Sequence, residues 1–163
     1  MKRPFRTLAF LAFAALLLHP APLAASGGTT TEAPAKAADP LARARELITA
    51  KQWPAAIAEL KRVNATGDAN WNNLMGYASR KGSPPDLASA EKYYGAALAI
   101  NPKHLGTLEY LGEMRLQQGD LAGAEKELAA LKAATFMKSE EYRDLQGAIE
   151  RYKAAGNKYV PKD

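Results

Sequence analysis

Apolar residues from Leu41 onward recur every three or four positions, which is the spacing of helices that bury one face. The pattern predicts three helix pairs and no strand, at residues 41–51 with 54–65, 69–81 with 86–100, and 105–118 with 121–133. Asp86 and Asp120 stand at the start of two second helices, where an aspartate carboxylate accepts the free amide hydrogens of the first turn. We therefore predict an all-α fold.

The second helix of each pair carries an alanine at a fixed interval of 34 residues, at Ala56, Ala90 and Ala124. Four residues after each alanine stands a large apolar residue, namely Leu60, Tyr94 or Leu128. Small residues let helix backbones approach closely, and large residues fill the space around the contact. The period therefore predicts one helix pair repeated three times.

Small residues also recur in the first helices, but at uneven intervals, at Ala44, Gly76 and Gly112. Residues 82–85 read Gly-Ser-Pro-Pro and lengthen the second turn. A surface loop accommodates such an insertion at small entropic cost, so the uneven interval is compatible with a regular repeat.

This period and these residue types resemble the tetratricopeptide repeat, a helix–turn–helix unit of 34 residues. The resemblance covers about residues 41–134 and is strongest at Asn101-Pro102, 108–112 and 118–121. It implies a right-handed superhelix of three repeats, at about 41–68, 69–102 and 103–134. The first repeat matches less well, because Pro40 and Arg43 stand where the motif favours an aromatic residue and a leucine.

Three further segments, 76–81, 108–112 and Glu141-Tyr142, are similar to small exported bacterial tetratricopeptide proteins of unassigned role. Members of that group can carry cysteines just before the final helix. This chain has Phe136 and Met137 there and contains no cysteine, so the resemblance gives no support for a redox role.

A last amphipathic helix is predicted at about 139–155, within a segment 135–155 that follows the repeats. Ser139 is its expected N-cap, and its apolar stripe consists of Tyr142, Leu145, Ile149 and Tyr152. A helix of this kind covers the exposed end of a repeat stack, and we interpret it as a capping helix. A partner-binding helix is the alternative. Residues 156–163 are predicted to form a frayed polar tail.

Residues 1–25 have the pattern of a secretory signal peptide. Lys2, Arg3 and Arg6 precede an apolar run at 8–18, which small residues follow. The run is too short to cross a bilayer, which needs about 20 apolar residues. We expect cleavage after Ala25, with Ser26 as the competing site, and hence an exported, periplasmic protein without a stable membrane span. Residues 26–40 are predicted to be a flexible linker.

Composition narrows the function classes. The formal net charge is +5, but three of the basic residues lie in the expected signal peptide, which leaves a mature excess too weak to indicate nucleic acid binding. Hydrophobic residues make up 47% and charged residues 24% of the chain, as in ordinary globular domains. The absence of cysteine excludes disulfides, thiolate metal sites and a cysteine nucleophile.

The sequence contains no recognisable catalytic constellation. His104, the single histidine outside the expected signal peptide, lies in an inter-repeat turn without a second group to make it a general base or metal ligand. The carboxylate pairs, Glu140 with Glu141 and Glu125 with Glu127, fall on solvated helix faces, and no glycine-rich phosphate loop follows a strand. We therefore predict no enzyme activity, no metal and no cofactor.

In tetratricopeptide stacks the first helix of each pair lines a concave groove that binds ligands. Projected onto this chain, the rule predicts these partner-binding residues: Asn70, Asn73, Tyr77, Arg80, Lys81, Glu109, Glu113 and Leu116, with Arg45 and Ile48 from the first repeat. Ordinary solvated helix positions are the alternative for each of them.

The function predicted from these observations is a non-catalytic adaptor or scaffold of the bacterial cell envelope. It is expected to be a monomer that binds a protein or peptide partner in its groove. A periplasmic, chaperone-like carrier of extended exported clients is the alternative, because amides beside a tyrosine can hydrogen-bond a peptide backbone without reading its sequence. A third class, an enzyme or its dedicated subunit, is disfavoured by the missing catalytic cluster.

Overall fold

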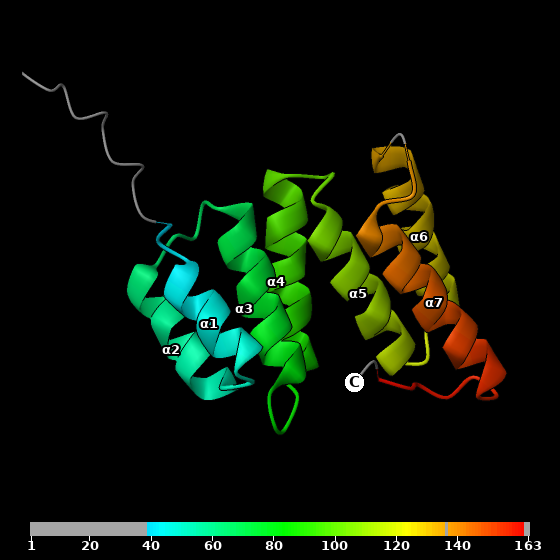
Figure 1. Cartoon of the computed structure of the whole chain (residues 1–163), viewed down its shortest axis with the longest axis horizontal. Coiled ribbons are helices and arrows are strands. Elements are labelled where there is room, and N and C mark those ends of the chain that lie inside the picture. The colour runs from blue at the N-terminus through cyan, green and yellow to red at the C-terminus, as the bar shows by residue number, and fades with distance from the viewer. Residues whose placement is uncertain (1–38, 136, 162–163) are drawn as a thin grey trace, which may run out of the picture. The chain divides into compact units, whose positions relative to one another are not determined.

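The computed structural model describes residues 39–135 and 137–161, and within them it contains seven helices and no strand (Figure 1). The helices are α1 (Ala42–Thr49), α2 (Trp53–Val63), α3 (Ala69–Lys81), α4 (Leu87–Ile100), α5 (Leu105–Gln117), α6 (Leu121–Ala134) and α7 (Glu140–Ala154). Every predicted helix is present, and each boundary lies within a few residues of its expected place. The all-α prediction is confirmed.

The helices begin at the residues that the sequence indicates. The side chains of Asp86, Asp120 and Ser139 accept hydrogen bonds from backbone amides three residues later, at 2.9, 2.8 and 3.2 Å. Each bond satisfies one of the amides that a helix start leaves without an intrahelical partner. By contrast, α1 has no side-chain cap and is only 8 residues long.

Two of the three turns within helix pairs have the same backbone form. Gln52 N donates to Leu47 O at 2.8 Å after α1, and Asp120 N donates to Arg115 O at 2.8 Å after α5. The residue before each donor, Lys51 or Gly119, is left-handed, with φ of 55° and 82° respectively. This is the Schellman ending of a helix, in which a left-handed residue turns the chain away from the helix axis.

The helices pack as three pairs and a final single helix. Contacts join α1 with α2, α3 with α4 and α5 with α6, and the first helices α1, α3, α5 and α7 also contact one another in sequence. Figure 1 shows the pairs following one another from α1 to α7. The structure is therefore a helical solenoid of tetratricopeptide type, as predicted.

The small residues of the repeat lie at the tightest contacts. Ala56, Ala90 and Ala124 are each 0% exposed. A Cβ atom added to Gly76 would meet the ring of Tyr94 at 2.5 Å, and one added to Gly112 would meet the side chain of Leu145 at 2.5 Å. The 34-residue period thus has a steric cause, since a larger side chain at these positions would force the helices apart.

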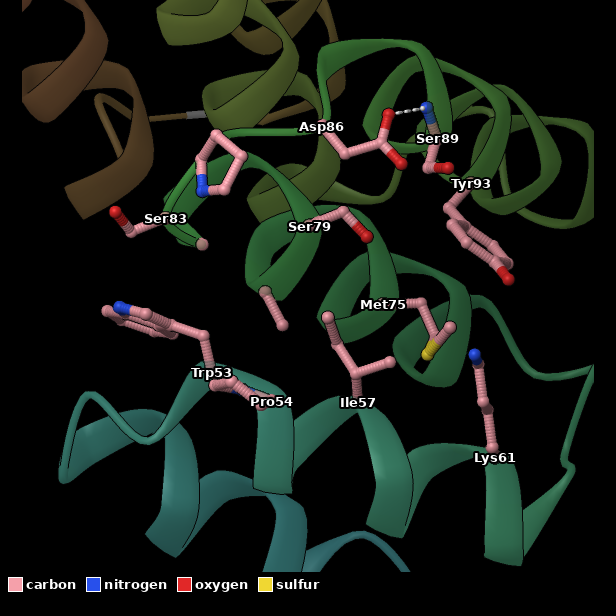
Figure 2. A pocket seen from close by; sticks show the side chains of 13 residues that line it. Trp53, Pro54, Ile57, Lys61, Met75, Ser79, Ser83, Asp86, Ser89 and Tyr93 are labelled. Carbon is pink, nitrogen blue, oxygen red and sulfur yellow. Dashed lines mark hydrogen bonds between the residues drawn. The ribbon is translucent and has the colours of Figure 1, made fainter.

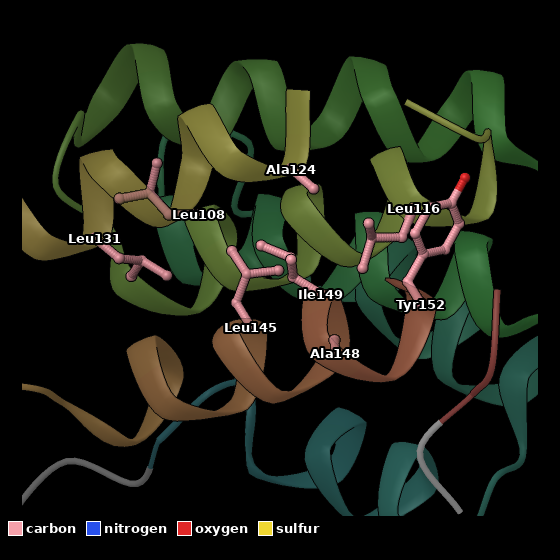
Figure 3. Packing of buried hydrophobic residues seen from close by; sticks show 8 residues of the cluster. All are labelled: Leu108, Leu116, Ala124, Leu131, Leu145, Ala148, Ile149 and Tyr152. Carbon is pink, nitrogen blue, oxygen red and sulfur yellow. The ribbon is translucent and has the colours of Figure 1, made fainter. Parts of the chain in front are cut away.

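Helix α7 covers the apolar side of the last pair (Figure 3). Its residues Leu145, Ala148, Ile149 and Tyr152 pack into one buried cluster with residues of α5 and α6. Leu116, which we expected to line the groove, belongs to this cluster and is 1% exposed. That expectation is wrong, because the Leu116 side chain points toward α7 and fills the interior.

The predicted signal peptide at 1–25 lies outside the described residues, as does the predicted linker except for Asp39 and Pro40. Asp39 belongs to the start of α1, where its carboxylate accepts a hydrogen bond from Leu41 N at 2.9 Å. None of the helices in the described ranges combines the length and the apolar character needed to cross a membrane.

Candidate functional site

The first-helix face, formed by α1, α3, α5 and α7, carries most of the predicted binding residues. Residues of α3 face residues one repeat later, at the start of α5 or within it. Four such pairs run along the α3–α5 interface: Asn70 with His104, Asn73 with Thr107, Tyr77 with Tyr110, and Arg80 with Glu113. The structure therefore joins these side chains to one another.

The first two pairs form a hydrogen-bonded network. Thr107 Oγ1 donates to Asn73 Oδ1 at 3.1 Å, and the Thr107 amide donates to His104 Nδ1 at 3.1 Å. Because Nδ1 accepts, the proton of the neutral ring lies on Nε2, which donates to Asn70 Oδ1 at 3.2 Å. Burial lowers the pKa of His104, which favours this neutral form. His104 is thus the N-cap of α5 rather than only a turn residue.

An ion pair closes the other end of the interface. Arg80 Nη2 lies 2.6 Å from Glu113 Oε2, and the two side chains are 1% and 12% exposed. Burial opposes the charge on the guanidinium, but Tyr94 and Glu113 more than offset it and raise the pKa of Arg80. We expected Arg80 and Asn73 to face solvent, and this is wrong, since both are buried between the helices.

Two aromatic rings lie against Arg80 of this ion pair, and a third ring packs beside them. The Tyr77 ring lies 4.5 Å from Tyr110 and 6.0 Å from Trp53, measured between centroids. The Arg80 guanidinium carbon lies 5.6 Å from the Tyr77 centroid and 5.9 Å from that of Tyr110, within the range of a cation–π contact. Burial raises the pKa of both tyrosines, so their hydroxyls stay protonated.

A pocket of about 380 Å³ opens at the α1–α3 interface, and it is the most promising binding site on this face. Its lining combines aromatic and cationic side chains: Arg45, Lys51, Trp53, Tyr77, Lys81 and Tyr110. Arg45 is paired with Asp39 at 3.3 Å. In the part of the chain that the structure describes, neither Lys51 nor Lys81 has a hydrogen-bond or ion-pair partner for its ammonium group.

The Lys81 ammonium group is near both positive and negative side chains. Burial and the positive charge of Arg80 lower the pKa of Lys81, the carboxylate of Glu113 opposes this, and the positive charge of Lys51 lowers it further. An anionic group placed between the two lysines would relieve this repulsion. The pocket is thus suited to a carboxylate that arrives beside an apolar or aromatic side chain.

A smaller, acidic pocket of about 200 Å³ adjoins it at the α5 side. Its lining includes Tyr77, Lys81, Glu109, Glu113, Asp144 and Tyr159. Glu109 is 8% exposed, so it contributes more to the wall than to an open surface. Lys81 and Tyr77 line both pockets and mark the boundary between them.

A third pocket, of about 420 Å³, lies on the other side of α3, between α2 and the start of α4 (Figure 2). Its walls are Trp53, Pro54, Ile57, Met75 and Tyr93, with a few serines at the edge. The hydrogen bond drawn there, from Ser89 N to Asp86, is the N-cap of α4. Nothing in this lining has the arrangement of an acid–base or nucleophilic site.

Several residues of the candidate site could not be identified from the 34-residue repeat pattern. Lys51 belongs to the turn after α1, Trp53 is the first residue of the second helix α2, and Tyr159 follows α7. Tyr110 could have been found, because it stands 33 residues after Tyr77 at the matching place of the next repeat. Over residues 39–135 and 137–161 no cluster of three His, Asp or Glu side chains is suited to hold a metal.

Comparison with known families gives one match. A family model described as tetratricopeptide repeat matches residues 86–155, from the N-cap of α4 to the end of α7. No curated protein and no solved structure gives a significant match. The family match includes α7, which therefore continues the row of first helices as well as capping the stack.

Proposed function

The chain is a tetratricopeptide repeat protein, and we propose that it is an adaptor whose first-helix face binds an extended segment of a partner protein. Tetratricopeptide repeats are interaction modules rather than enzymes, and they generally mediate contacts between proteins. The finer proposal is that the partner segment enters at the α1–α3 interface, with an acidic side chain between Lys51 and Lys81 and an apolar neighbour against Trp53.

The single observation that supports this proposal is the α1–α3 pocket. It offers two ammonium groups that have no ionic partner among residues 39–135 and 137–161, beside a tryptophan and two tyrosines. Aromatic residues dominate the energy of protein interfaces, because they bury a large rigid surface with little loss of conformational freedom. Opposite charge adds selectivity and speeds association.

The proposal can be tested with an array of synthetic peptides and purified protein. Peptides with an acidic residue next to an aromatic or aliphatic one should be enriched among the binders. Trp53→Ala should weaken their binding by about 2 kcal/mol or more, as expected for a buried aromatic anchor. Lys81→Gln should weaken acidic peptides more than their amide counterparts.

Lys126→Ala is a matched control, because Lys126 is exposed on α6 away from both first-helix pockets. Its binding should equal that of the parent chain. If Lys126→Ala abolishes binding while a folded Trp53→Ala variant retains it, the site lies elsewhere on the molecule.

The carrier alternative draws its support from the amides Asn70 and Asn73. The side-chain oxygen of each amide is hydrogen-bonded to a residue of the α5 region, so these two acceptors are already used within the chain. This favours the adaptor. Pull-down experiments discriminate further, since an adaptor retains one stoichiometric partner and a carrier retains many unrelated clients.

We also propose that the protein is exported and works as a monomer in the periplasm. The support is the sequence pattern of residues 1–25. N-terminal sequencing of the protein from a periplasmic fraction should begin at Ser26. A chain that begins at Met1 and stays in the membrane fraction would contradict the proposal.

A further inference from the structure

Residues 156–161 turn back toward the first-helix face instead of extending the axis of α7. Asn157 N donates to Tyr152 O at 3.0 Å, and Gly156 N donates to Lys153 O at 3.1 Å, which is a Schellman ending. Gly156 and Asn157 are both left-handed, with φ of 67° and 62°. Figure 1 shows the segment doubling back from the end of α7 toward the end of α5.

One side chain of this segment points inward. Tyr159 is partly buried and packs against the apolar cluster of α5, α6 and α7. Its neighbours Lys158, Val160 and Pro161 are exposed. The alternation is that of an extended peptide held by a single aromatic anchor.

The anchor lies at the proposed binding face. The Tyr159 hydroxyl accepts a hydrogen bond from Arg80 Nη1 at 3.4 Å, a contact between residues 79 positions apart in the sequence. Tyr159 also lines the pocket that Lys81, Glu113 and Asp144 line. The same guanidinium therefore carries the Glu113 ion pair on one nitrogen and Tyr159 on another.

We infer that residues 157–161 are an internal ligand of the first-helix face, and that a partner segment which presents a tyrosine displaces them. This inference rests on the proposed function for its partner, and on the Tyr159–Arg80 contact for its site. The tail shows which chemistry the acidic pocket accepts, namely an aromatic ring with a terminal hydroxyl, carried on extended backbone.

The tail is attached weakly enough to be displaced. Only one of its side chains is anchored, and no backbone hydrogen bond joins 158–161 to the rest of the described chain. Its short tether to α7 gives an effective concentration on the order of millimolar. A competing peptide binds only to molecules whose tail is undocked, so its apparent affinity falls in proportion to the undocked fraction. Removal of the Tyr159 side chain should restore that affinity.

Docking of the tail can be measured without any partner. Because the chain contains no cysteine, Lys158→Cys accepts a single nitroxide label on an exposed position. The label should broaden the NMR amide signals of Lys81 and Glu113. Adding Tyr159→Ala should restore those signals, whereas Tyr159→Phe should retain much of the broadening. Signals that are the same with and without Tyr159→Ala would overturn the inference.

Competition is tested with a defined probe, the synthetic peptide of residues 156–163, and with the same peptide carrying alanine in place of its tyrosine. At millimolar concentration the first peptide should shift the Lys81 and Glu113 signals of the Tyr159→Ala chain, and shift those of the parent chain at least about threefold less at equal concentration. Equal shifts in both chains, or equal shifts from the alanine peptide, would overturn the inference. Failure of the peptide array to yield binders contradicts only the proposed function, because the label experiment reports on the tail alone.

Discussion

The two interfaces that α3 makes with its neighbouring first helices differ in how they are filled. At the α3–α5 interface an amide–hydroxyl–imidazole network and a buried ion pair join the helices directly. At the α1–α3 interface the helices pack through an apolar cluster, but a pocket of about 380 Å³ opens beside it, and two ammonium groups there lack ionic partners among the described residues.

This difference shows that a binding face cannot be equated with the whole row of first helices. Polar residues on α3 that point toward α5 hold the repeats together, and a partner would have to break their bonds to reach them. Lys81, at the end of α3, lines the pocket on the α1 side. Helix α3 therefore contributes stability on its α5 side, and on its α1 side it lines the pocket that we propose as the binding site.

The largest expected effect comes from breaking the closed interface. Arg80→Ala leaves Glu113 without its partner in a buried position, and should lower the free energy of unfolding by about 3–5 kcal/mol. Denaturant unfolding followed by circular dichroism measures this. The matched control is Arg43→Ala, which removes an exposed ion pair with Glu46 and should change stability by under about 1 kcal/mol. Similar losses from both variants would show that the α3–α5 ion pair is not a structural element.

The next largest effect concerns the two left-handed turns. Gly119→Ala places a Cβ atom at φ 82° and should destabilise the protein by about 1–2 kcal/mol. Thermal melts compare it with Gly95→Ala, since a Cβ at Gly95 meets no atom within 4 Å and no left-handed φ is found there. An equal melting temperature for Gly119→Ala and the parent chain would contradict the described turn.

Lys51→Gly sharpens the comparison by separating stability from binding. Lys51 is left-handed at φ 55°, where glycine is favoured, so the substitution should stabilise the protein by about 0.5–1 kcal/mol. It also removes one ammonium group from the α1–α3 pocket, so acidic peptides should bind less tightly. Thermal unfolding tests the gain in stability, and calorimetric titration of the same preparation tests the loss of binding. A variant that binds acidic peptides as well as the parent chain would remove Lys51 from the site.

The smallest effect is a pH dependence of the closed interface. The folded protein holds the pKa of His104 below its ordinary value of 6.5, mainly by burial, while Asp68 and Glu141 act in the opposite direction. The unfolded chain therefore binds the proton first as the pH falls. The contribution of His104 to stability is complete above pH 6.5 and is lost progressively as the pH falls toward the folded-state pKa.

His104→Asn provides the control, because asparagine can also cap a helix but does not titrate. Urea unfolding at about pH 7.5 and about pH 5.5 should show a smaller pH effect in the variant than in the parent chain. Identical pH effects would mean that protonation of His104 does not weaken the interface.

The fold could be predicted from the sequence because its causes are local and repeated. Ala56, Ala90 and Ala124 mark the close helix contacts, and Asp86, Asp120 and Ser139 mark helix starts. The candidate site was harder to predict from the sequence. The register of a helix shows which side chains share a face, but not which residue each side chain contacts. Arg80 reads as a surface cation until Glu113, from the next repeat, is brought to 2.6 Å from it.

Tyr159 could not have been found by any periodic argument. Its position depends on the left-handed pair Gly156 and Asn157, whose effect on chain direction is invisible in a hydrophobicity pattern. The prediction for Leu116 was wrong for the opposite reason. Leu116 follows the periodicity of the groove positions, but α7 packs over that part of α5 and buries its side chain.

The uncapped start and short length of α1 have a consequence for the order in which the solenoid opens. In a linear array each helix pair is stabilised mainly by its neighbour, and the first pair has a neighbour on one side only. Because its interface with α3 contains the open pocket, α1 and α2 should exchange their amide hydrogens by sub-global opening before α3 to α7 do. A partner segment bound in the pocket would contact both the α1–α2 pair and the α3–α4 pair, and would slow that exchange. Binding in the pocket could thus be measured as slower hydrogen exchange at α1 and α2 amides that the ligand does not contact.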